Sequence, residues 1–354
     1  MRRVLVTGGC GFIGTNYVLN IACARPEWRV VVLDKLTYAG NLCNVATLVS
    51  DPGYRFVHGD ICDRELLERV FAEEEIDSVI HFAAESHVDR SISGPGAFVR
   101  TNVVGTFTLL ECARMAWADR SDRDRCRFVH VSTDEVYGSL GVTGRFTEET
   151  RYDPRSPYAA SKAASDHLAR AYFHTYGLPT IITNCSNNYG PYQFPEKLIP
   201  LAIQNAIEGR RIPVYGDGRN VRDWLYVGDH CSALRVVLER GRVGETYNIG
   251  GSNERQNLEV VETVCDALDE RLGLGEDGQP RRSLITFVED RPGHDRRYAI
   301  DASKVRQEFG WQPQVCFEDG IRTTVDWYLE NREWVATVTD GSYREYCRKM
   351  CDDR

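Results

Sequence analysis

Tyr158 and Lys162 are the two residues whose types and spacing most clearly suggest chemistry. Four positions apart on a helix, they lie on one face, one turn from each other. A lysine ammonium beside a phenol favours the phenolate, which predicts a lowered pKa for Tyr158. A phenolate is a base that takes the proton of an alcohol while hydride leaves the carbon. The pair therefore predicts a site for the oxidation of an alcohol.

A second chemical feature is the segment Thr133-Asp134-Glu135, which lies shortly before that helix. Two neighbouring carboxyl groups push their pKa values apart, so one can stay an acid while the other ionises. Adjacent residues of a strand point to opposite faces, so the pair is expected in the loop beyond a strand. Oxidation of an alcohol alone needs no such pair. The segment indicates a reaction with further proton transfers, unless the two acids only cap a helix or a turn.

Three glycines near the N-terminus, Gly8, Gly11 and Gly14, follow an expected strand at 4–6 and precede an expected helix over 15–24. Gly8 allows a tight turn, Gly11 lets the backbone approach a pyrophosphate, and Gly14 lets the helix pack close to the strand. The spacing, G-x-x-G-x-x-G, differs from the G-x-G-x-x-G of typical dehydrogenases. In this strand–turn–helix context the pattern predicts a dinucleotide site.

An acid at the end of the second expected strand predicts which dinucleotide binds. Asp34 ends the run 30–34, 20 residues after Gly14. A carboxylate in this position binds the ribose 2′-hydroxyl and repels a 2′-phosphate. Lys35 weakens the argument slightly, but NAD is favoured over NADP. Asp60, after the third expected strand, is placed to reach the adenine.

Strands and helices alternate through the first half of the chain. This alternation predicts the α/β class, with a Rossmann-type doubly wound parallel sheet covered by helices on both faces. Ligands bind at the carboxyl ends of such strands, which is where the motifs above fall. The expected strands are 4–6, 30–34, 55–58, 78–82, 127–131 and one near 180–182, and the expected helices are 63–75, 95–118 and 157–176.

The alternation loosens after residue 190, where proline and glycine cluster. We therefore expect an NAD-binding domain over 1–189 and a smaller mixed C-terminal substrate domain over 190–354. A strand near 245–250 is expected to return to the first sheet, so the boundary is interleaved. The segment 281–297 contains five arginines and His294, which suits a diphosphate.

Composition argues against several classes of partner and site. The net charge of −9, with no basic block, argues against nucleic acid or an anionic membrane surface as a partner. No apolar run reaches transmembrane length, and Met1-Arg2-Arg3 leads into a strand without the apolar core of a signal peptide. The 12 cysteines include no C-x-x-C pair, and Cys347 and Cys351 lack further metal ligands. We expect a cytoplasmic protein with no metal site and with cysteines that are small buried hydrophobes.

Motifs spread over most of the chain resemble the extended short-chain dehydrogenase/reductase family. More narrowly, they are similar to its nucleotide-sugar 4,6-dehydratases, those acting on dTDP-glucose. The tyrosine–lysine pair alone would indicate only the superfamily, whereas the acid pair and the N-N-Y-G-P-Y-Q run are more specific. The motifs are DKLTYAGNL at 34–42, AAESHVDRS at 83–91, STDEVYG at 132–138, SPYAASKA at 156–163, SNNYGPYQFPEKLIP at 186–200, VRDWLYV at 221–227, NERQNLEVV at 253–261 and DRPGHDRRY at 290–298.

The resemblance implies a mechanism. Tyr158 would take the proton of the sugar 4-hydroxyl as hydride passes to NAD, Lys162 would hold the nicotinamide ribose, and Thr133 would orient the hydroxyl. Glu135 would then remove the C5 proton, and Asp134, kept protonated, would donate to the departing 6-hydroxyl. Hydride return to C6 would leave a 4-keto-6-deoxy sugar and regenerated NAD.

The resemblance also implies the binding residues and a homodimer, formed by the helices at 95–118 and 157–176 as a four-helix bundle. The cofactor set is Gly8, Gly11, Phe12, Ile13, Gly14, Asp34, Lys35, Leu36, Thr37, Asp60, Ile61, Phe82, Ala83, Ala84, Ser86, Thr101, Tyr158, Lys162 and Asn188. The nucleotide-sugar set is Ser86, Thr133, Asn187, Lys197, Leu198, Pro213, Val214, Tyr215, Arg222, Asn257, Asp290, Arg291, Pro292, Gly293 and His294.

Departures from the family pattern leave alternatives open. Cys10, Asn184 and Arg219-Asn220 differ from the usual residues, which puts the nucleotide and the sugar in doubt. A related dehydratase on another nucleotide sugar, such as GDP-mannose, would have a similar acid arrangement. A C4 epimerase would need the tyrosine and the lysine but not the acid pair, and a decarboxylase would need a carboxylate-binding group. A non-catalytic NAD-binding scaffold would be expected to lack a proton-transfer residue.

Overall fold

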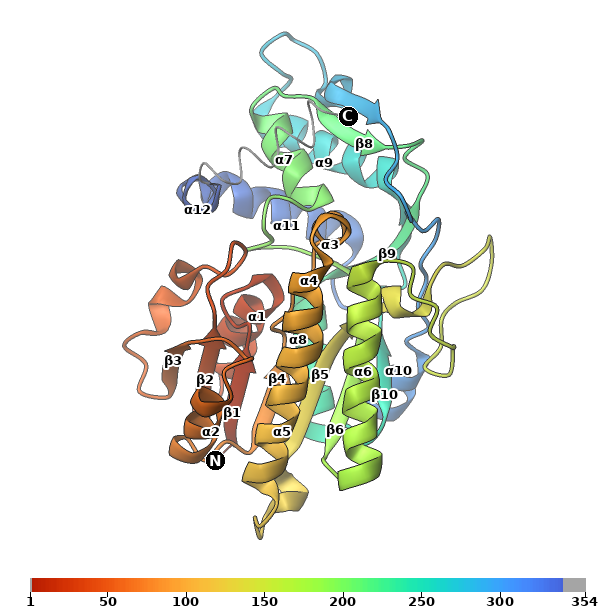
Figure 1. Ribbon diagram of the computed structural model, residues 1–354. Helices are drawn as coiled ribbons and strands as arrows, with labels where there is room; N and C mark the ends of the chain where they lie inside the picture. The colour runs from red at the N-terminus through yellow and green to blue at the C-terminus, as the bar shows by residue number, and fades with distance from the viewer. Residues whose placement is uncertain (1, 340–354) are drawn as a thin grey trace.

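The computed structural model describes residues 2–339, and its centre is a seven-stranded parallel sheet (Figure 1). The strand order is β10-β6-β5-β4-β1-β2-β3. The chain starts in the middle, runs outward to β3, and then crosses to β4 on the other side of β1. This reversal creates the switch point at which doubly wound sheets bind ligands. The strands are β1 (Arg2–Thr7), β2 (Trp28–Asp34), β3 (Tyr54–His58), β4 (Ser78–His81), β5 (Arg127–Thr133), β6 (Thr180–Cys185) and β10 (Thr246–Ile249).

The strands carry nearly continuous apolar runs because helices cover both faces of the sheet. Val4, Leu5 and Val6 of β1, for example, are fully buried. One hydrophobic core lies under α1 and α8, and another lies on the opposite face under α2, α5 and α6. The predicted α/β, Rossmann-type class is confirmed. These helices are α1 (Phe12–Tyr17), α2 (Arg64–Glu73), α5 (Thr106–Trp117), α6 (Pro157–Tyr176) and α8 (Val227–Arg240).

Two of the expected helices are not uniform α-helix. The helix expected over 95–118 begins as α4 (Pro95–Phe98), widens into π-helical turns over Val99–Gly105 and continues as α5. The helix expected over 15–24 begins earlier, as α1, and passes into π-helical turns over Val18–Ala22. A hydrophobic period does not distinguish these hydrogen-bonding patterns, so the sequence could not show them.

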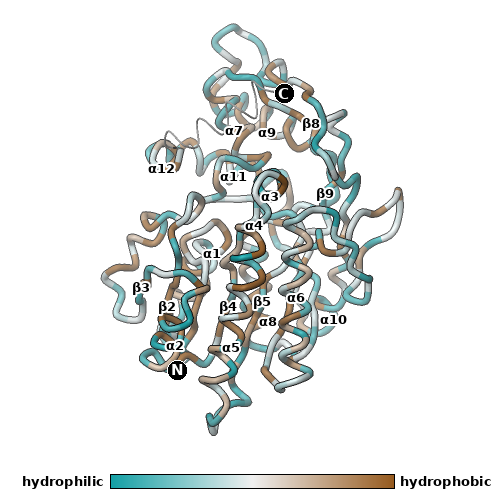
Figure 2. The backbone as a smooth tube through the Cα atoms, in the orientation of Figure 1, coloured by the Kyte–Doolittle hydropathy of each residue, from teal (hydrophilic) through white to brown (hydrophobic). Residues whose placement is uncertain are grey.

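Most of the residues after β6 build a second layer above the carboxyl ends of the large sheet (Figure 1). A three-stranded sheet, β11-β9-β7, and a pair, β12-β8, pack with helices around a separate core. Figure 2 shows hydrophobic (brown) stretches along the strands of the large sheet. The elements are β7 (Asn187–Tyr189), β8 (Ile212–Tyr215), β9 (Val221–Tyr226), β11 (Glu254–Gln256), β12 (Ile285–Val288), α7 (Leu198–Ile207), α9 (Asn257–Leu272), α11 (Phe317–Glu330) and α12 (Arg332–Val338).

The chain passes between the two layers several times. β7 pairs with β9 in the smaller sheet, and α8 then returns to the large sheet, where β10 pairs with β6. The space between the layers is therefore lined by segments that lie far apart in sequence. The remaining elements are α3 (Val88–Ser93), α10 (Ser303–Phe309) and the 3₁₀ turns Leu42–Leu48, Arg123–Arg125, Asp134–Tyr137 and Arg281–Leu284.

Two further expectations concern membrane spans and cysteines. Within residues 2–339, no helix is long and apolar enough to cross a membrane. The ten cysteines in this range are free thiols, and six of them are buried. Cys347, Cys351 and the charged stretch 340–354 lie outside the described residues.

Trp117 offers a test of the core under α2 and α5. Its side chain is fully buried, its ring meets Phe71 edge-on, and its Nε1 donates to the carbonyl of Ile76 at 2.7 Å. We expect Trp117→Ala to lower the free energy of unfolding by about 3–5 kcal/mol, through the cavity it creates. Urea denaturation measures the loss. Asp119→Ala, an exposed change near the same helix end, should leave the midpoint unchanged; equal midpoints for both variants would contradict the packing.

Candidate active site

The acid pair lies in the 3₁₀ turn that follows β5 directly. Thr133 ends the strand with extended backbone, and its Oγ1 accepts a hydrogen bond from the amide of Glu135 at 3.3 Å. Gly138 closes the turn with a φ of 87°, a conformation that favours glycine. The turn interrupts the alternation of a strand, so Asp134 and Glu135 both line one cavity at the carboxyl edge of the sheet.

Helix α6 holds Tyr158 and Lys162 against the end of β5. Ser156 caps the helix, because its Oγ accepts a hydrogen bond from the amide of Ala159 at 3.0 Å. Lys162 Nζ donates to the carbonyl of Val131 in β5 at 2.9 Å. Both side chains are buried and line the same cavity as the acid pair. The structure thus brings all five expected catalytic residues to one place.

The pKa of Tyr158 differs from the sequence-based expectation. Burial, followed by the charge of Glu135, raises the pKa of Tyr158 well above its ordinary value. Burial also lowers the pKa of Lys162, and its ammonium is directed to the carbonyl of Val131. The spacing on the helix correctly put the two side chains on one face, but it could not show that both are buried. The prediction of a lowered pKa for Tyr158 is therefore wrong.

The two carboxyl groups have different surroundings. Burial and the neighbouring Glu135 raise the pKa of Asp134 well above its ordinary value, which favours its protonated form. Burial also raises the pKa of Glu135, but the positive charges of Arg291, Lys197 and Arg222 oppose the rise. The same turn therefore holds one carboxyl group suited to act as an acid and another placed among cations.

A cavity of about 320 Å³ connects these groups to the glycine turn. Gly8 has a φ of 71°, and a Cβ there would lie 2.6 Å from the amide nitrogen of Ala83. A Cβ on Gly14 would lie 2.1 Å from the carbonyl oxygen of Gly8. Only glycine fits such close backbone packing, and a turn of this kind lets backbone amides approach phosphates.

Asp34 lies at the end of β2, where the sequence places the ribose acid. Its Oδ2 accepts the amide of Cys10 at 2.9 Å and its Oδ1 accepts the amide of Leu36 at 2.8 Å. The carboxylate therefore also fixes the glycine turn. Lys35 pairs with Asp60 at 2.7 Å, which neutralises the cation that weakened the choice of NAD.

The expected cofactor residues, with the exception of Leu36, line the cavity that holds the catalytic groups. A glycine turn, a strand-end acid and an apolar wall form a set that fits a dinucleotide. Those lining it are Gly8, Gly11, Phe12, Ile13, Gly14, Asp34, Lys35, Thr37, Asp60, Ile61, Phe82, Ala83, Ala84, Ser86, Thr101, Tyr158, Lys162 and Asn188.

The expected nucleotide-sugar residues divide into two groups. Ser86, Thr133, Asn187 and Lys197 line the cavity, and Lys197 Nζ donates to the carbonyl of Ser86 at 3.0 Å. The others lie outside the cavity lining, in the second layer, and Val214 is buried in its core. They are Leu198, Pro213, Val214, Tyr215, Arg222, Asn257, Asp290, Arg291, Pro292, Gly293 and His294.

Two cations of the second layer lie near the acid pair. Arg222 is buried and donates to the carbonyl of Asp295 at 2.9 Å. Arg291 pairs with Asp89 at 2.9 Å, and Tyr215 Oη donates to the same carboxylate at 3.0 Å. The Nε atom of Arg291 is buried without a hydrogen-bond partner among the described residues. An unpaired guanidinium donor beside this cavity suits an anionic ligand.

The arginine-rich segment 281–297 does not act as one anion site. Arg281, Arg282, Arg296 and Arg297 pair with acids elsewhere in the second layer, namely Asp269, Asp266, Asp217 and Glu254. His294 pairs with Asp290 at 2.6 Å, and burial lowers its pKa to about 4. Of the five arginines, Arg291 has the largest effect on the pKa of Glu135, which it lowers. Residue counting could not show which acids face which arginines.

The sequence-based interpretation missed two acids that line the cavity, Glu85 and Glu196. Glu196 is nearly fully buried, its Oε2 accepts from Arg90 Nε at 3.1 Å, and burial raises its pKa. Burial also raises the pKa of Glu85. Both lie inside motifs that carry the family resemblance, so their positions were a signal.

Among the described residues, no group of three or more His, Cys, Asp or Glu is arranged to hold a metal ion.

Comparisons with known proteins agree with this geometry. The family model described as GDP-mannose 4,6 dehydratase matches residues 5–324. The dTDP-glucose 4,6-dehydratase of Xanthomonas campestris pv. campestris strain B100 is 63% identical, over 97% of this chain and 98% of that protein. The dTDP-glucose 4,6-dehydratase 1 of Escherichia coli K12 is 54% identical over 99% of each chain.

Solved structures give the same answer. A dTDP-glucose 4,6-dehydratase from Streptomyces venezuelae, solved with NAD and dTDP bound, is 50% identical with a TM-score of 0.86, over 95% of this chain and 99% of that one. The UDP-glucose 4-epimerase of Thermus thermophilus, solved with NAD, is 32% identical with a TM-score of 0.81, over 93% and 99%. The dehydratases match more closely than the epimerase, and the acid pair after β5 accords with them. The chain therefore belongs to the dTDP-glucose 4,6-dehydratases of the extended short-chain dehydrogenase/reductase family.

Proposed function

We propose that this protein catalyses the NAD-dependent dehydration of dTDP-glucose to dTDP-4-keto-6-deoxyglucose, a hydro-lyase reaction. The observation that carries the proposal is the acid pair, Asp134 and Glu135, in the turn beside Tyr158. An enzyme that only oxidises C4 or inverts it needs no such pair. The relatives named above are dehydratases of this substrate, which supports the choice of sugar and nucleotide.

Five side chains carry the proton transfers. Thr133 Oγ1 orients the sugar 4-hydroxyl, and Tyr158 Oη takes its proton, assisted by the ammonium of Lys162. Bound NAD supplies the hydride acceptor for C4 and the hydride donor for C6. Glu135 takes the C5 proton, which the 4-ketone has made acidic, and Asp134 gives its proton to the departing 6-hydroxyl. Glu135 returns a proton to C5, so the proton gained by Tyr158 balances the proton lost by Asp134.

The electrostatics of the site support these assignments. A general acid must keep its proton, and burial beside Glu135 raises the pKa of Asp134. A general base must ionise, and Arg291, Lys197 and Arg222 favour the carboxylate of Glu135. The elimination thus draws on a difference in environment between two adjacent residues of the same type.

Each layer of the molecule then has a ligand. We assign NAD to the residues that line the cavity between the glycine turn and α6, within domain 1–189 and its returning strand. We assign the nucleotide and the diphosphate to the 190–354 part, with Arg222 and Arg291 as the diphosphate partners. Asn257 contributes a buried Oδ1 with no hydrogen-bond partner among the described residues, which suits a donor on the ligand.

We also propose a cytoplasmic homodimer. Val99, Val104, Phe107 and Met115 project apolar side chains into solvent from the π-helical turns and α5, at 46–53% exposure. Such a row on one helical segment is suited to burial against the same segment of a second copy.

The reaction itself is tested with purified protein. Incubation with dTDP-glucose should give a 4-keto-6-deoxy product without net accumulation of NADH, because the cofactor is regenerated in each turnover. Product is measured by its mass and by the absorbance of the keto sugar in alkali. UDP-, GDP- and CDP-glucose assayed in parallel should turn over at least about tenfold more slowly. Stoichiometric NADH, or a product of unchanged mass, would contradict dehydration.

Glu135→Gln separates the oxidation from the elimination. The amide cannot take the C5 proton, so product formation should fall by at least about a hundredfold. Exchange of the C5 proton with deuterium from solvent, followed by NMR, should fall equally, whereas the initial reduction of bound NAD should survive better. Glu65→Gln, at an exposed site on α2, is the control and should behave as wild type. Undiminished C5 exchange in Glu135→Gln would exclude this residue as the base.

Phe107→Glu tests the dimer. A charge buried in the interface is costly, so the variant should sediment as a monomer of about half the wild-type mass. Val142→Glu alters a side chain that is 95% exposed outside these helices and should sediment as wild type. Analytical ultracentrifugation distinguishes the two results. A monomeric wild-type protein would overturn the assignment.

A further inference from the structure

Asp166 is a fully buried acid that the mechanism above does not use. It lies on α6, one helical turn after Lys162. Its Oδ2 accepts hydrogen bonds from Ser132 Oγ at 2.9 Å, from Tyr152 Oη at 2.9 Å and from Asn184 Nδ2 at 3.4 Å. A buried carboxylate without a direct ion pair to lysine or arginine is costly, so its presence calls for a role.

The hydrogen bonds of Asp166 converge on the segment that carries the catalytic acids. Ser132 immediately precedes Thr133, and Asn184 Nδ2 also donates to the carbonyl of Thr133 at 3.0 Å. His130 Nε2 lies 3.1 Å from Asp166 Oδ1. The Asp166 carboxylate therefore contacts the last residues of β5 directly, at Ser132, and indirectly, through Asn184 of β6. It joins the helix that holds Tyr158 to the strand that ends in the acid pair.

We propose that Asp166 is a positioning residue, which keeps the proton on Lys162 and fixes the end of β5 against α6. The inference rests on the proposed function, because it assigns Asp166 a part in the oxidation of C4. It acts through Lys162 and through the backbone at Thr133 rather than by touching the substrate.

The charges around Lys162 support the first part of the role. Burial lowers the pKa of Lys162, and the negative charge of Asp166 raises it. Burial favours the neutral forms of three other titratable neighbours: it lowers the pKa of His81 and of His130, and it raises that of Cys185 to about 12. Among the described residues, Asp166 is therefore the ionised acid that opposes the loss of the lysine proton.

Asp166 itself is kept ionised by its partners. Burial alone would raise its pKa, but the nearby His130, the charge of Lys162 and the hydrogen bond from Ser132 hold the pKa of Asp166 below its ordinary value. Hydrogen-bond donors that carry no full positive charge stabilise the Asp166 carboxylate without cancelling its charge. The negative charge of Asp166 therefore still acts on Lys162.

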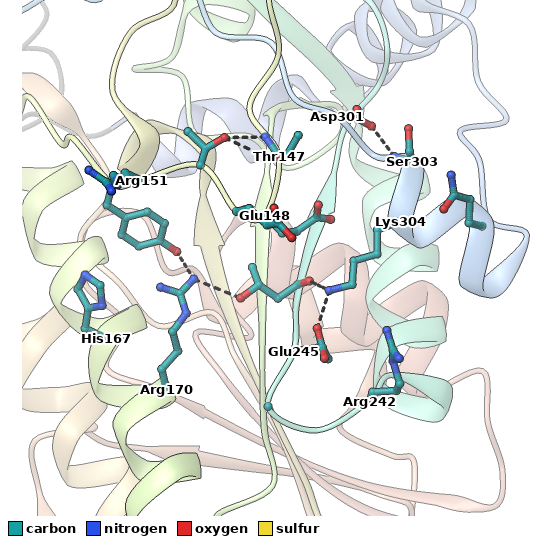
Figure 3. Close-up of a pocket in the computed structure, with 16 residues that line it drawn as sticks. Thr147, Glu148, Arg151, His167, Arg170, Arg242, Glu245, Asp301, Ser303 and Lys304 are labelled. Carbon is teal, nitrogen blue, oxygen red and sulfur yellow. Dashed lines mark hydrogen bonds and ion pairs between the residues drawn. The ribbon is translucent and has the colours of Figure 1, made fainter.

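Tyr152, one of the hydrogen-bond donors to Asp166, lies at a second cavity. Tyr152 and Arg170 line this cavity, which is open and polar and has a volume of about 980 Å³ (Figure 3). Arg170 Nη2 donates to Tyr152 Oη at 2.9 Å and to Thr246 Oγ1 at 3.2 Å. The guanidinium thus meets Asp166 only through the tyrosine hydroxyl, which it orients toward the carboxylate.

The charge of Lys162 can be measured directly, because the chain contains five lysines. Holoenzyme labelled with ¹³C at lysine Cε gives one NMR signal per lysine, and Lys162→Arg identifies the signal of interest. In Asp166→Asn the titration midpoint of Lys162 should fall by at least about one pH unit, because the variant removes the opposing negative charge. A midpoint within about 0.3 unit of wild type would overturn the proposal.

The catalytic consequence is measured on the first step alone. With dTDP-6-deoxyglucose, which has no 6-hydroxyl to eliminate, the reaction stops at reduced cofactor, and the absorbance at ~340 nm gives the oxidation rate. In Asp166→Asn the oxidation rate reached at high pH should fall at least about tenfold, and the midpoint of the pH–rate profile should move to lower pH. As the pH rises in this variant, Lys162 loses its proton before the phenolate of Tyr158 can form. An unchanged rate at high pH would overturn the proposal. Failure of the wild type to reduce NAD would instead contradict the proposed function, while the NMR result would still judge Asp166.

Asp77 provides the matched control. It is also a buried acid, accepting from Ser78 Oγ at 2.7 Å and from the amide of Arg3 at 3.0 Å, but it lies at the opposite end of the sheet. Asp77→Asn should leave the lysine midpoint and the oxidation rate unchanged, and a change equal to that of Asp166→Asn would overturn the proposal. If Asp166→Asn does not fold by circular dichroism, Asp166→Ser, which also removes the charge and leaves room for water, is measured in the same way.

Discussion

The active site depends on one contact, between helix α6 and the carboxyl end of strand β5. Lys162 Nζ donates to the carbonyl of Val131, and Asp166 binds Ser132 one step further along the strand. These bonds hold the tyrosine and the lysine of the helix beside the acids of the following turn. The residues that transfer protons in the proposed reaction lie on the two sides of this contact, in α6 and in the turn after β5. A shift of helix against strand would separate the oxidation chemistry from the elimination chemistry.

Burial shifts the pKa values of the groups at this contact. The same desolvation that raises the pKa of Asp134 also raises that of Tyr158 and lowers that of Lys162. It therefore favours a general acid and opposes both a phenolate and an ammonium. The site needs compensating charges, which the fold supplies from several directions. Cations of the second layer act on Glu135, and a buried acid on α6 acts on Lys162.

The two layers of the molecule meet at the same point for a topological reason. Parallel strands place all their carboxyl ends at one edge, and the chain crosses from the large sheet to the second layer at that edge. Arg222 on β9 and Arg291 after β12 are thereby brought near an acid at the end of β5. The interleaving of the layers, with α8 and β10 returning to the large sheet, holds this arrangement in place.

The sequence by itself determined the elements and the chemical types. The alternation of strands and helices predicted the sheet, the glycine spacing predicted the dinucleotide turn, and the acid at Asp34 predicted NAD. These signals are readable from sequence because local sterics and periodicity act over a few residues. Motif resemblance named the catalytic and binding residues. Tertiary structure alone decided the pKa of Tyr158, the partners of the arginines at 281–297 and the presence of Asp166 under Lys162. Burial and ion pairing depend on residues far apart in sequence, so no local pattern records them.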